Sequence, residues 1–198
     1  NRLKKASFLG GFFVVIFLAL TACDASSAEG KMVFRYNESA GIPSLDPAFA
    51  KEKSSIWVVQ QLYEGLVALD SGNDIVPALA MNWQVDSSAT IYTFELRETS
   101  FHNGKTLEAE DVVYSLNRLK DPKVASPGSW VVGDIAKIQT LNASSVKIIL
   151  RQPNASFLSL LAMPFCSIIP KDAETLNTTP LGTGPFKFHV WHYGEKMV

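Results

Sequence analysis

The sequence predicts a mixed α+β fold, and three observations indicate it. Segments with the two-residue alternation of strands and segments with helical spacing follow one another in mixed order, which disfavours the strict alternation of a doubly wound sheet. Hydrophobic residues make up 47% of the 198 residues, enough to bury the core of one domain or of two small ones. The chain contains no internal repeat and no low-complexity tract.

The first 22 residues predict an export signal. Arg2, Lys4 and Lys5 precede residues 8–22, which carry no charge, and this is the order of the basic and hydrophobic regions of a signal peptide. A membrane-spanning helix needs about 20 apolar residues, so the shorter run disfavours a permanent transmembrane anchor. We therefore expect residues 1–22 to be a signal peptide.

The sequence Leu20-Thr21-Ala22-Cys23 resembles the bacterial lipobox. This resemblance implies that the Cys23 thiol carries diacylglycerol and becomes the N-terminus after cleavage, with ordinary secretion as the alternative. Residues 23–30 are mostly small and polar, as in a flexible tether. Because the sequence opens with Asn1 and stops at Val198 without a helix stop, we also expect the chain to be a fragment of a longer protein.

The chain that follows begins with a strand, a helix and a hairpin. Residues 31–36 favour a strand that ends at the turn-forming residues around Gly41. Apolar residues at helical spacing predict an amphipathic helix over 56–66, with Gly65 near its C-terminal cap. Two strand-like runs, 75–86 and 89–97, then predict a β-hairpin.

The second half predicts further helices and strands. Asn103-Gly104 is a strong tight-turn signal. A helix is expected to begin near Glu108 and to end at Asp121-Pro122, because acidic residues in its first turn favour the helix dipole. Residues 145–153 predict a strand, residues 155–163 a short helix, and residues 182–192 a turn that leads into a strand.

Composition and motifs exclude several function classes. The net charge of −1 is spread along the chain, so no basic stripe suggests nucleic acid. Neither of the two cysteines, Cys23 and Cys166, has a partner at metal-ligand spacing, and no nucleophile and base set can be assembled. Cys166 is expected to be a buried thiol. We expect no catalytic residues, no metal and no cofactor. Trp130 is equally compatible with packing and with ligand contact.

Residues 66–122 closely resemble family 5 of the extracytoplasmic solute-binding proteins, the peptide receptors of ABC importers. Three motifs carry the resemblance, namely P-x-L-A-x-x-W-x-V from Pro77, Y-T-F-x-L-R from Tyr92, and F-H-x-G-x-x-x-x-A-E-D-V-x-x-S-L from Phe101. The pieces SLDP from Ser44, YEGLV from Tyr63 and GTGPFKF from Gly182 also agree with the family.

The resemblance implies a two-lobed fold of the periplasmic-binding-protein type II, of which the chain holds the first lobe with its satellite domain. By the family pattern, residues 31–65 begin domain I, residues 66–170 form satellite domain II, and residues 171–198 return into domain I. One departure is Glu108, where the family usually has Thr as the N-cap. Because one cleft wall is present, we expect the fragment alone to bind no peptide at micromolar affinity.

The resemblance further implies a monomeric, lipid-anchored receptor that captures di- or oligopeptides in the periplasm and delivers them to an ABC permease and ATPase. Ala50, Lys51, Glu52 and Lys53 resemble the segment that runs beside the bound peptide. Some relatives place a ligand-facing aromatic residue where this chain has Gly128. Trp130, two residues later, is therefore the aromatic candidate for ligand contact in this chain. The alternatives are another solute (a nickel complex, haem, glutathione or a sugar), a peptide sensor or chaperone, and an extracytoplasmic hydrolase.

Overall fold

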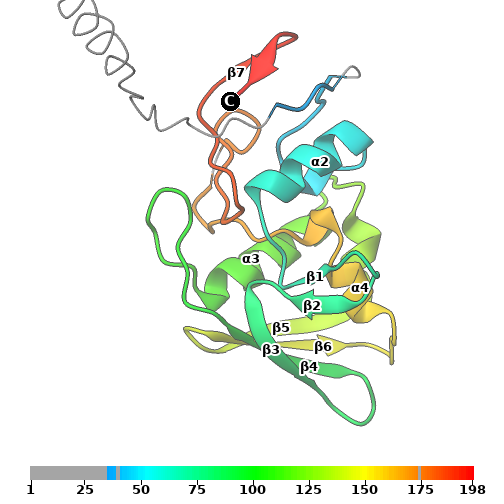
Figure 1. The fold of residues 1–198 in the computed structure, drawn as a ribbon. Coiled ribbons are helices and arrows are strands. Elements are labelled where there is room, and N and C mark those ends of the chain that lie inside the picture. Colours follow the sequence, from blue (N-terminus) through cyan, green and yellow to red (C-terminus); the bar gives the residue numbers. More distant parts are fainter. Residues whose placement is uncertain (1–34, 39–40, 174) are drawn as a thin grey trace, which may run out of the picture. The chain divides into compact units, whose positions relative to one another are not determined.

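The computed structural model describes residues 35–38, 41–173 and 175–198 (Figure 1). The expected signal peptide, Cys23 and the tether lie outside the described residues, as does most of the expected strand 31–36. Residues 38–198 form one compact unit. Within the described part of the chain, no helix is both long enough and apolar enough to cross a membrane.

The unit contains helices and strands in mixed order, as the sequence predicts. In chain order, the elements are η1 (Pro47–Phe49), α2 (Lys53–Leu62), β1 (Val67–Leu69), β2 (Ile75–Pro77), β3 (Ala80–Val85), β4 (Ile91–Leu96), α3 (Ala109–Lys120), η2 (Ser129–Val132), β5 (Ile135–Asn142), β6 (Ser145–Leu150), α4 (Phe157–Leu161), η3 (Pro164–Cys166), β7 (Trp191–His192) and β8 (Lys196–Met197).

A four-stranded sheet is the largest element of the fold. Its strands lie in the order β3-β4-β6-β5, and each neighbouring pair is antiparallel. The expected hairpin forms from β3 and β4, with Trp83 opposite Phe94. Along β4 the buried residues Tyr92, Phe94 and Leu96 alternate with more exposed ones, so one face of the strand packs inward and the other faces solvent.

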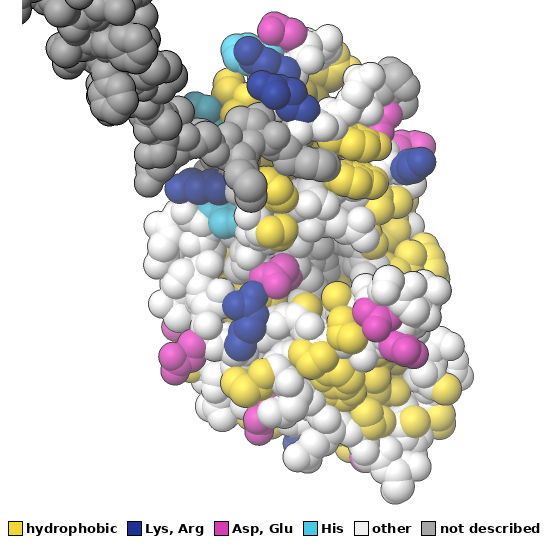
Figure 2. Space-filling view, in the orientation of Figure 1, with side chains coloured by type: hydrophobic (Ala, Val, Ile, Leu, Met, Phe, Trp, Pro, Cys, Tyr) yellow, Lys and Arg dark blue, Asp and Glu magenta, His cyan; other side chains and the backbone are white. Residues whose placement is uncertain are grey.

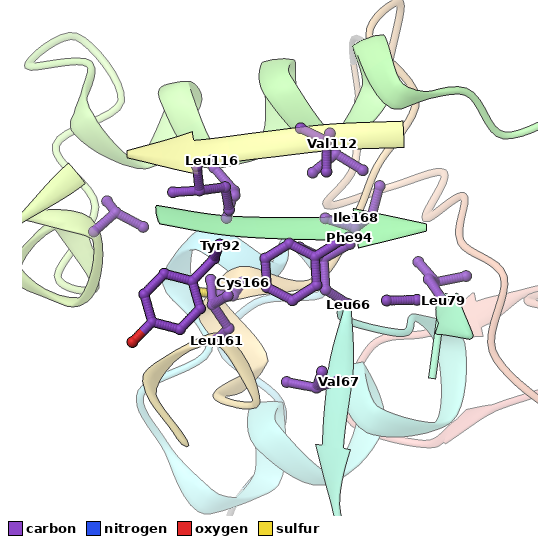
Figure 3. Packing of buried hydrophobic residues seen from close by; sticks show 14 of the residues in the cluster. Leu66, Val67, Leu79, Tyr92, Phe94, Val112, Leu116, Leu161, Cys166 and Ile168 are labelled. Atoms are coloured by element: carbon purple, nitrogen blue, oxygen red, sulfur yellow. The ribbon is translucent and has the colours of Figure 1, made fainter. Parts of the chain in front are cut away.

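Helix α3 covers the buried face of this sheet, and together they make the main core (Figure 3). Val112 and Leu116 from α3 are fully buried in the same cluster as Phe94 from β4. Leu161 from α4 and Cys166 from η3 close the cluster from the other side (Figure 3). Apolar spacing on α3 and strand alternation therefore produce one shared core.

A second, smaller hydrophobic cluster forms around α2. It consists of Leu45, Ala50, Val58, Val59, Leu62, Tyr63, Ile169 and Leu176. Apart from Ala48, which packs in the main cluster, the chain passes from the second cluster to the main one after Tyr63 and returns before Ile169. The two passes run beside each other, since the Ile168 amide donates to the Glu64 carbonyl at 2.8 Å.

Three expected element boundaries are wrong. The expected strand 75–86 is divided into β2 and β3, because residues 78 and 79 leave the β1 pairing before the β4 pairing begins. Helix α2 ends at Leu62, and Gly65 does not cap it. The backbone is extended at Tyr63 because the next residues form hydrogen bonds to distant segments, including one from Leu79 N to the Gly65 carbonyl at 3.1 Å. The strand expected within 182–192 is limited to Trp191–His192, since the Gly184 and Phe186 amides donate instead to carbonyls at the end of α2.

Candidate ligand-binding surface

The segment expected to run beside a ligand, residues 50–53, joins η1 to α2. Ala50 is fully buried, backbone included, so in this structure it offers no surface to a ligand, whereas Lys51, Glu52 and Lys53 are exposed. Lys51 Nζ lies 3.9 Å from Glu52 Oε1, and both side chains are more than half exposed. Such a surface ion pair contributes little stability, which leaves both charges available to a ligand.

Residues 44–46 give this segment a fixed starting point. Asp46 is the N-cap of η1, where its Oδ1 accepts a hydrogen bond from Ala48 N at 2.9 Å, and Pro47 begins the turn. The turn continues with hydrogen bonds from Ala50 N to the Pro47 carbonyl at 3.1 Å and from Lys51 N to the Phe49 carbonyl at 2.8 Å. The backbone up to Lys51 is therefore ordered by local hydrogen bonds.

Asp46 also forms a buried ion pair with α3. Arg118 donates from both terminal nitrogens, to Asp46 Oδ1 at 2.9 Å and to Asp46 Oδ2 at 2.5 Å. The side chains of Arg118 and Asp46 are only 19% and 6% exposed. Burial and the nearby Asp46 carboxylate raise the pKa of Tyr63, which keeps that phenol neutral beside the pair.

The segment that contains Trp130 is joined to the same region. Ser126 Oγ donates to the Ala48 carbonyl at 2.5 Å, and Gly128 N donates to Ser126 Oγ at 3.0 Å. Trp130 follows in η2 with 60% of its surface exposed. The structure thus connects the turn before Trp130 to η1, the element that directly precedes residues 50–53.

Gly128 is required by packing at this point. A Cβ atom there would lie 2.5 Å from Cδ1 of Phe165, which is itself buried in the main core. An aromatic side chain at position 128 would therefore displace Phe165. The exposed aromatic residue of this segment is Trp130.

Trp83 and Trp191 are less exposed than Trp130. Trp83 packs against the main core, and Trp191 packs against the cluster around α2. The sequence reasoning did not identify Arg118, Ser126 or Asn177 as partners of residues 44–48. The SLDP motif was a signal for Asp46, but nothing in a single sequence connects Asp46 with residues so distant along the chain.

A shallow groove elsewhere on the unit shares no residue with this surface. It lies between α3 and β5, has a volume of about 540 Å³, and is lined by Glu110, Val113, Tyr114, Ile138, Gln139, Thr140 and Lys171. Lys171 pairs with Glu110 across one end of it. On the face of the molecule drawn in Figure 2, acidic and basic side chains are scattered, and no continuous basic stripe is visible.

The described residues offer no arrangement typical of a catalytic centre. No three His, Cys, Asp or Glu side chains in this part of the chain could hold a metal ion. Burial raises the pKa of the Cys166 thiol to about 12, so Cys166 stays protonated and is a poor nucleophile. His102 Nε2 is engaged with the Gly184 carbonyl at 2.9 Å.

Comparison with known proteins gives concordant results for sequence and structure. Residues 74–198 match the family model of the bacterial extracellular solute-binding proteins, family 5, middle part. Di/tripeptide-binding protein 2 of Pseudomonas aeruginosa is 31% identical to the chain over 89% of the chain and 38% of its own length. The chain therefore spans well under half the length of this relative.

Two solved structures share the fold. The protein AgaA of A. tumefaciens R10, in complex with agropinic acid, superposes with a TM-score of 0.75 and 33% identity over 79% of this chain and 33% of its own. The periplasmic binding protein DppA of Helicobacter pylori, in complex with the peptide STSA, gives a TM-score of 0.72 and 31% identity over 79% of this chain and 36% of its own. Both confirm the expected mixed α+β architecture of a periplasmic binding protein.

Proposed function

The chain belongs to family 5 of the bacterial extracellular solute-binding proteins, and on this premise we propose that it is part of the peptide receptor of an ABC importer. Members of the family are solute-binding proteins. The observation that carries the proposal is the match of residues 74–198 to this family, together with the similarity to a di/tripeptide-binding protein. The partners would be a peptide ligand, an ABC permease and its ATPase.

In this proposal the protein binds its solute and does not transform it. Two lobes close over the ligand. Because the ligand binds the closed state more tightly than the open state, binding shifts the equilibrium between them towards the closed state. Residues 50–53 and Trp130 would line one wall of the cleft. The exposure of residues 51–53 and of Trp130, and the connection of both segments to η1, support this assignment.

The arrangement of the hydrophobic clusters supports the proposed domain boundaries. Residues 31–65 and 171–198 would belong to domain I, and residues 66–170 would form satellite domain II. The main cluster draws almost all of its residues from Leu66 to Ile168, while the cluster around α2 lies before and after that range.

A second candidate ligand is a solute other than a peptide. The similarity to a protein solved with agropinic acid supports this possibility, because the same fold there holds a different class of molecule. Calorimetry on the full-length protein distinguishes the two. We expect di- and tripeptides to bind and to be recovered intact by chromatography. Hydrolysis of the peptides would contradict a receptor, and binding of other solutes alone would favour the second candidate.

We further propose that the protein is exported by residues 1–22 and anchored to the membrane in the periplasm through lipid on Cys23, followed by the tether 23–30. The lipobox-like sequence supports this proposal, because acyl chains hold a protein domain at a bilayer. In bacteria that express the full-length protein, Cys23→Ser is expected to release it from the membrane fraction. Retention of the variant in that fraction would contradict the proposal.

A further inference from the structure

We propose that Arg118 is a positioning residue for ligand binding, because its ion pair with Asp46 fixes the backbone of residues 47–51 in the ligand-facing conformation. This inference rests on the proposed function, in which residues 50–53 line the cleft. Arg118 itself lies in α3, in the satellite part of the fold. It would act on the ligand through the η1 turn.

The geometry of the pair is specific enough for this role. The two terminal nitrogens of Arg118 reach different oxygens of Asp46, at 2.9 and 2.5 Å. This bidentate arrangement fixes the carboxylate plane as well as its position, which a lysine cannot do. The same Asp46 Oδ1 also accepts the hydrogen bond from Ala48 N that begins η1, so the direction of η1 depends on the orientation of this carboxylate.

Five further hydrogen bonds hold the same turn from different parts of the chain. Asn177 Oδ1 accepts from Ser44 Oγ at 2.6 Å, from Leu45 N at 3.3 Å and from Asp46 N at 3.2 Å. Ser55 Oγ in α2 accepts from Ser44 N at 3.1 Å. With Ser126 bound to Ala48, the turn is connected to α2, to α3, to the turn before Trp130 and to the returning chain.

Such connections matter for binding because a segment that is already ordered loses less conformational entropy when a ligand arrives. Among the residues that the structure describes, Arg118 is the one side chain with hydrogen bonds to both oxygens of Asp46. Lysine at position 118 keeps the positive charge beside Asp46 but provides a single point contact. Arg118→Lys therefore tests orientation, without leaving a buried carboxylate unpaired.

The experiment uses the full-length protein and trialanine as the probe. We expect Arg118→Lys to weaken trialanine binding about fivefold by calorimetry, at a temperature where circular dichroism shows the variant to be folded. The matched control is Arg97→Lys, which alters a second arginine ion pair, Arg97 with Glu64 at 2.7 Å, that shares no residue with η1. This control is expected to change the Kd less than twofold. A Kd for Arg118→Lys equal to that of the wild type or of Arg97→Lys would overturn the inference.

A mutant cycle separates positioning from a general loss of structure. In a Lys51→Ala/Glu52→Ala background, Arg118→Lys is expected to have little further effect on the Kd, because coupled residues are not additive. An equal effect of Arg118→Lys in both backgrounds would overturn the inference. If Arg118→Lys fails to fold, the double variant Asp46→Asn/Arg118→Met replaces it in the cycle. This double variant removes both charges and therefore leaves no buried charge unpaired.

Hydrogen exchange without ligand tests the positioning apart from the proposed function. The amides of Ala50 and Lys51 are bonded within the η1 turn, so Arg118→Lys should accelerate their exchange at least fivefold while Arg97→Lys leaves it unchanged. Faster exchange in a protein that binds neither trialanine nor another peptide would contradict the proposed function alone. Unchanged exchange would contradict the positioning role.

Discussion

Gly128 illustrates how a single position can be determined by packing. The space that a side chain would need there is occupied by Phe165 of the main core. We expect Gly128→Ala to lower the free energy of unfolding by about 1–3 kcal/mol, because an added methyl group forces neighbouring atoms apart. Urea denaturation of the full-length protein measures this effect.

The control for this prediction is Gly72→Ala in the turn between β1 and β2. The nearest atom to a Cβ at Gly72 is Oδ1 of Asp70 at 3.3 Å, on a side chain that can move. The free energy of unfolding is expected to change by less than about 1 kcal/mol there. Equal losses for Gly128→Ala and Gly72→Ala would contradict the packing argument.

Asp86 gives a pH dependence at the turn between β3 and β4. Hydrogen bonds from the Ser88 side chain and from the backbone amides of Ile91, Thr90 and Ser88 lower the pKa of Asp86 from 3.8 to about 2. A lowered pKa in the folded state means that the ionised carboxylate stabilises the fold above pH 3.8, and that this contribution is lost as the pH falls towards 2. Asp86→Asn should therefore be less stable than the wild type at pH 7.

The measurement for Asp86 is a series of urea denaturation curves between pH 7 and pH 2. The difference in midpoint between the wild type and Asp86→Asn is expected to be constant down to about pH 4 and to shrink below it, as the carboxylate of the wild type becomes protonated. A difference that stays constant down to pH 2 would exclude this explanation.

At the scale of elements, helix α3 depends on a buried acid in its first turn. Asp111 is fully buried, and its Oδ2 accepts from Glu108 N while its Oδ1 accepts from Lys171 N, both at 2.9 Å. Asp111→Ala leaves two amides without their acceptor and should lower the free energy of unfolding by about 2 kcal/mol. Denaturation in urea provides the measurement.

Glu110 is the matched control for Asp111, since it is the neighbouring acid of the same turn. Its side chain is 62% exposed and pairs with Lys171 on the surface. Such pairs contribute about 0–1 kcal/mol, so Glu110→Ala is expected to have a small effect. If Glu110→Ala and Asp111→Ala were equally destabilising, dipole charge rather than capping would explain the first turn.

The elements themselves could largely be predicted from the sequence, and the errors have a physical reason. Acidic first-turn residues and apolar spacing locate α3 within a residue of its observed start at Ala109. The predicted end of α2 is wrong because apolar spacing continues past Leu62. The backbone after Leu62 is instead held in an extended conformation by hydrogen bonds to residues distant along the chain. A local pattern carries no information on such partners.

At the scale of the whole molecule, the motifs from Pro77 to Leu116 predicted the family and the fold, which the comparisons confirm. The candidate site could be predicted only in part. Residues 50–53 and Trp130 came from the resemblance and remain a prediction. Arg118 could not be found from the sequence, because its contact with Asp46 exists only once α3 and η1 have packed together.

The length of the chain leads to a prediction about binding. The chain covers 38% of a di/tripeptide-binding relative, and in our proposal it supplies one wall of a cleft. We expect residues 31–198 alone to bind no peptide at micromolar affinity, while the full-length protein does. Calorimetry with the same peptides on both proteins measures the difference. A micromolar isotherm with residues 31–198 would show that one wall is sufficient.

The hydrogen bond between Glu64 and Ile168 has a consequence for engineering. The segment between these two residues begins and ends at neighbouring positions, because the Ile168 nitrogen lies 2.8 Å from the Glu64 carbonyl oxygen. A stretch whose entrance and exit coincide can be exchanged for a homologous cassette without stretching the host backbone, if the cassette keeps Arg118 and Ser126 as partners of Asp46 and Ala48. The four-stranded sheet and its helix would then be a graftable insert.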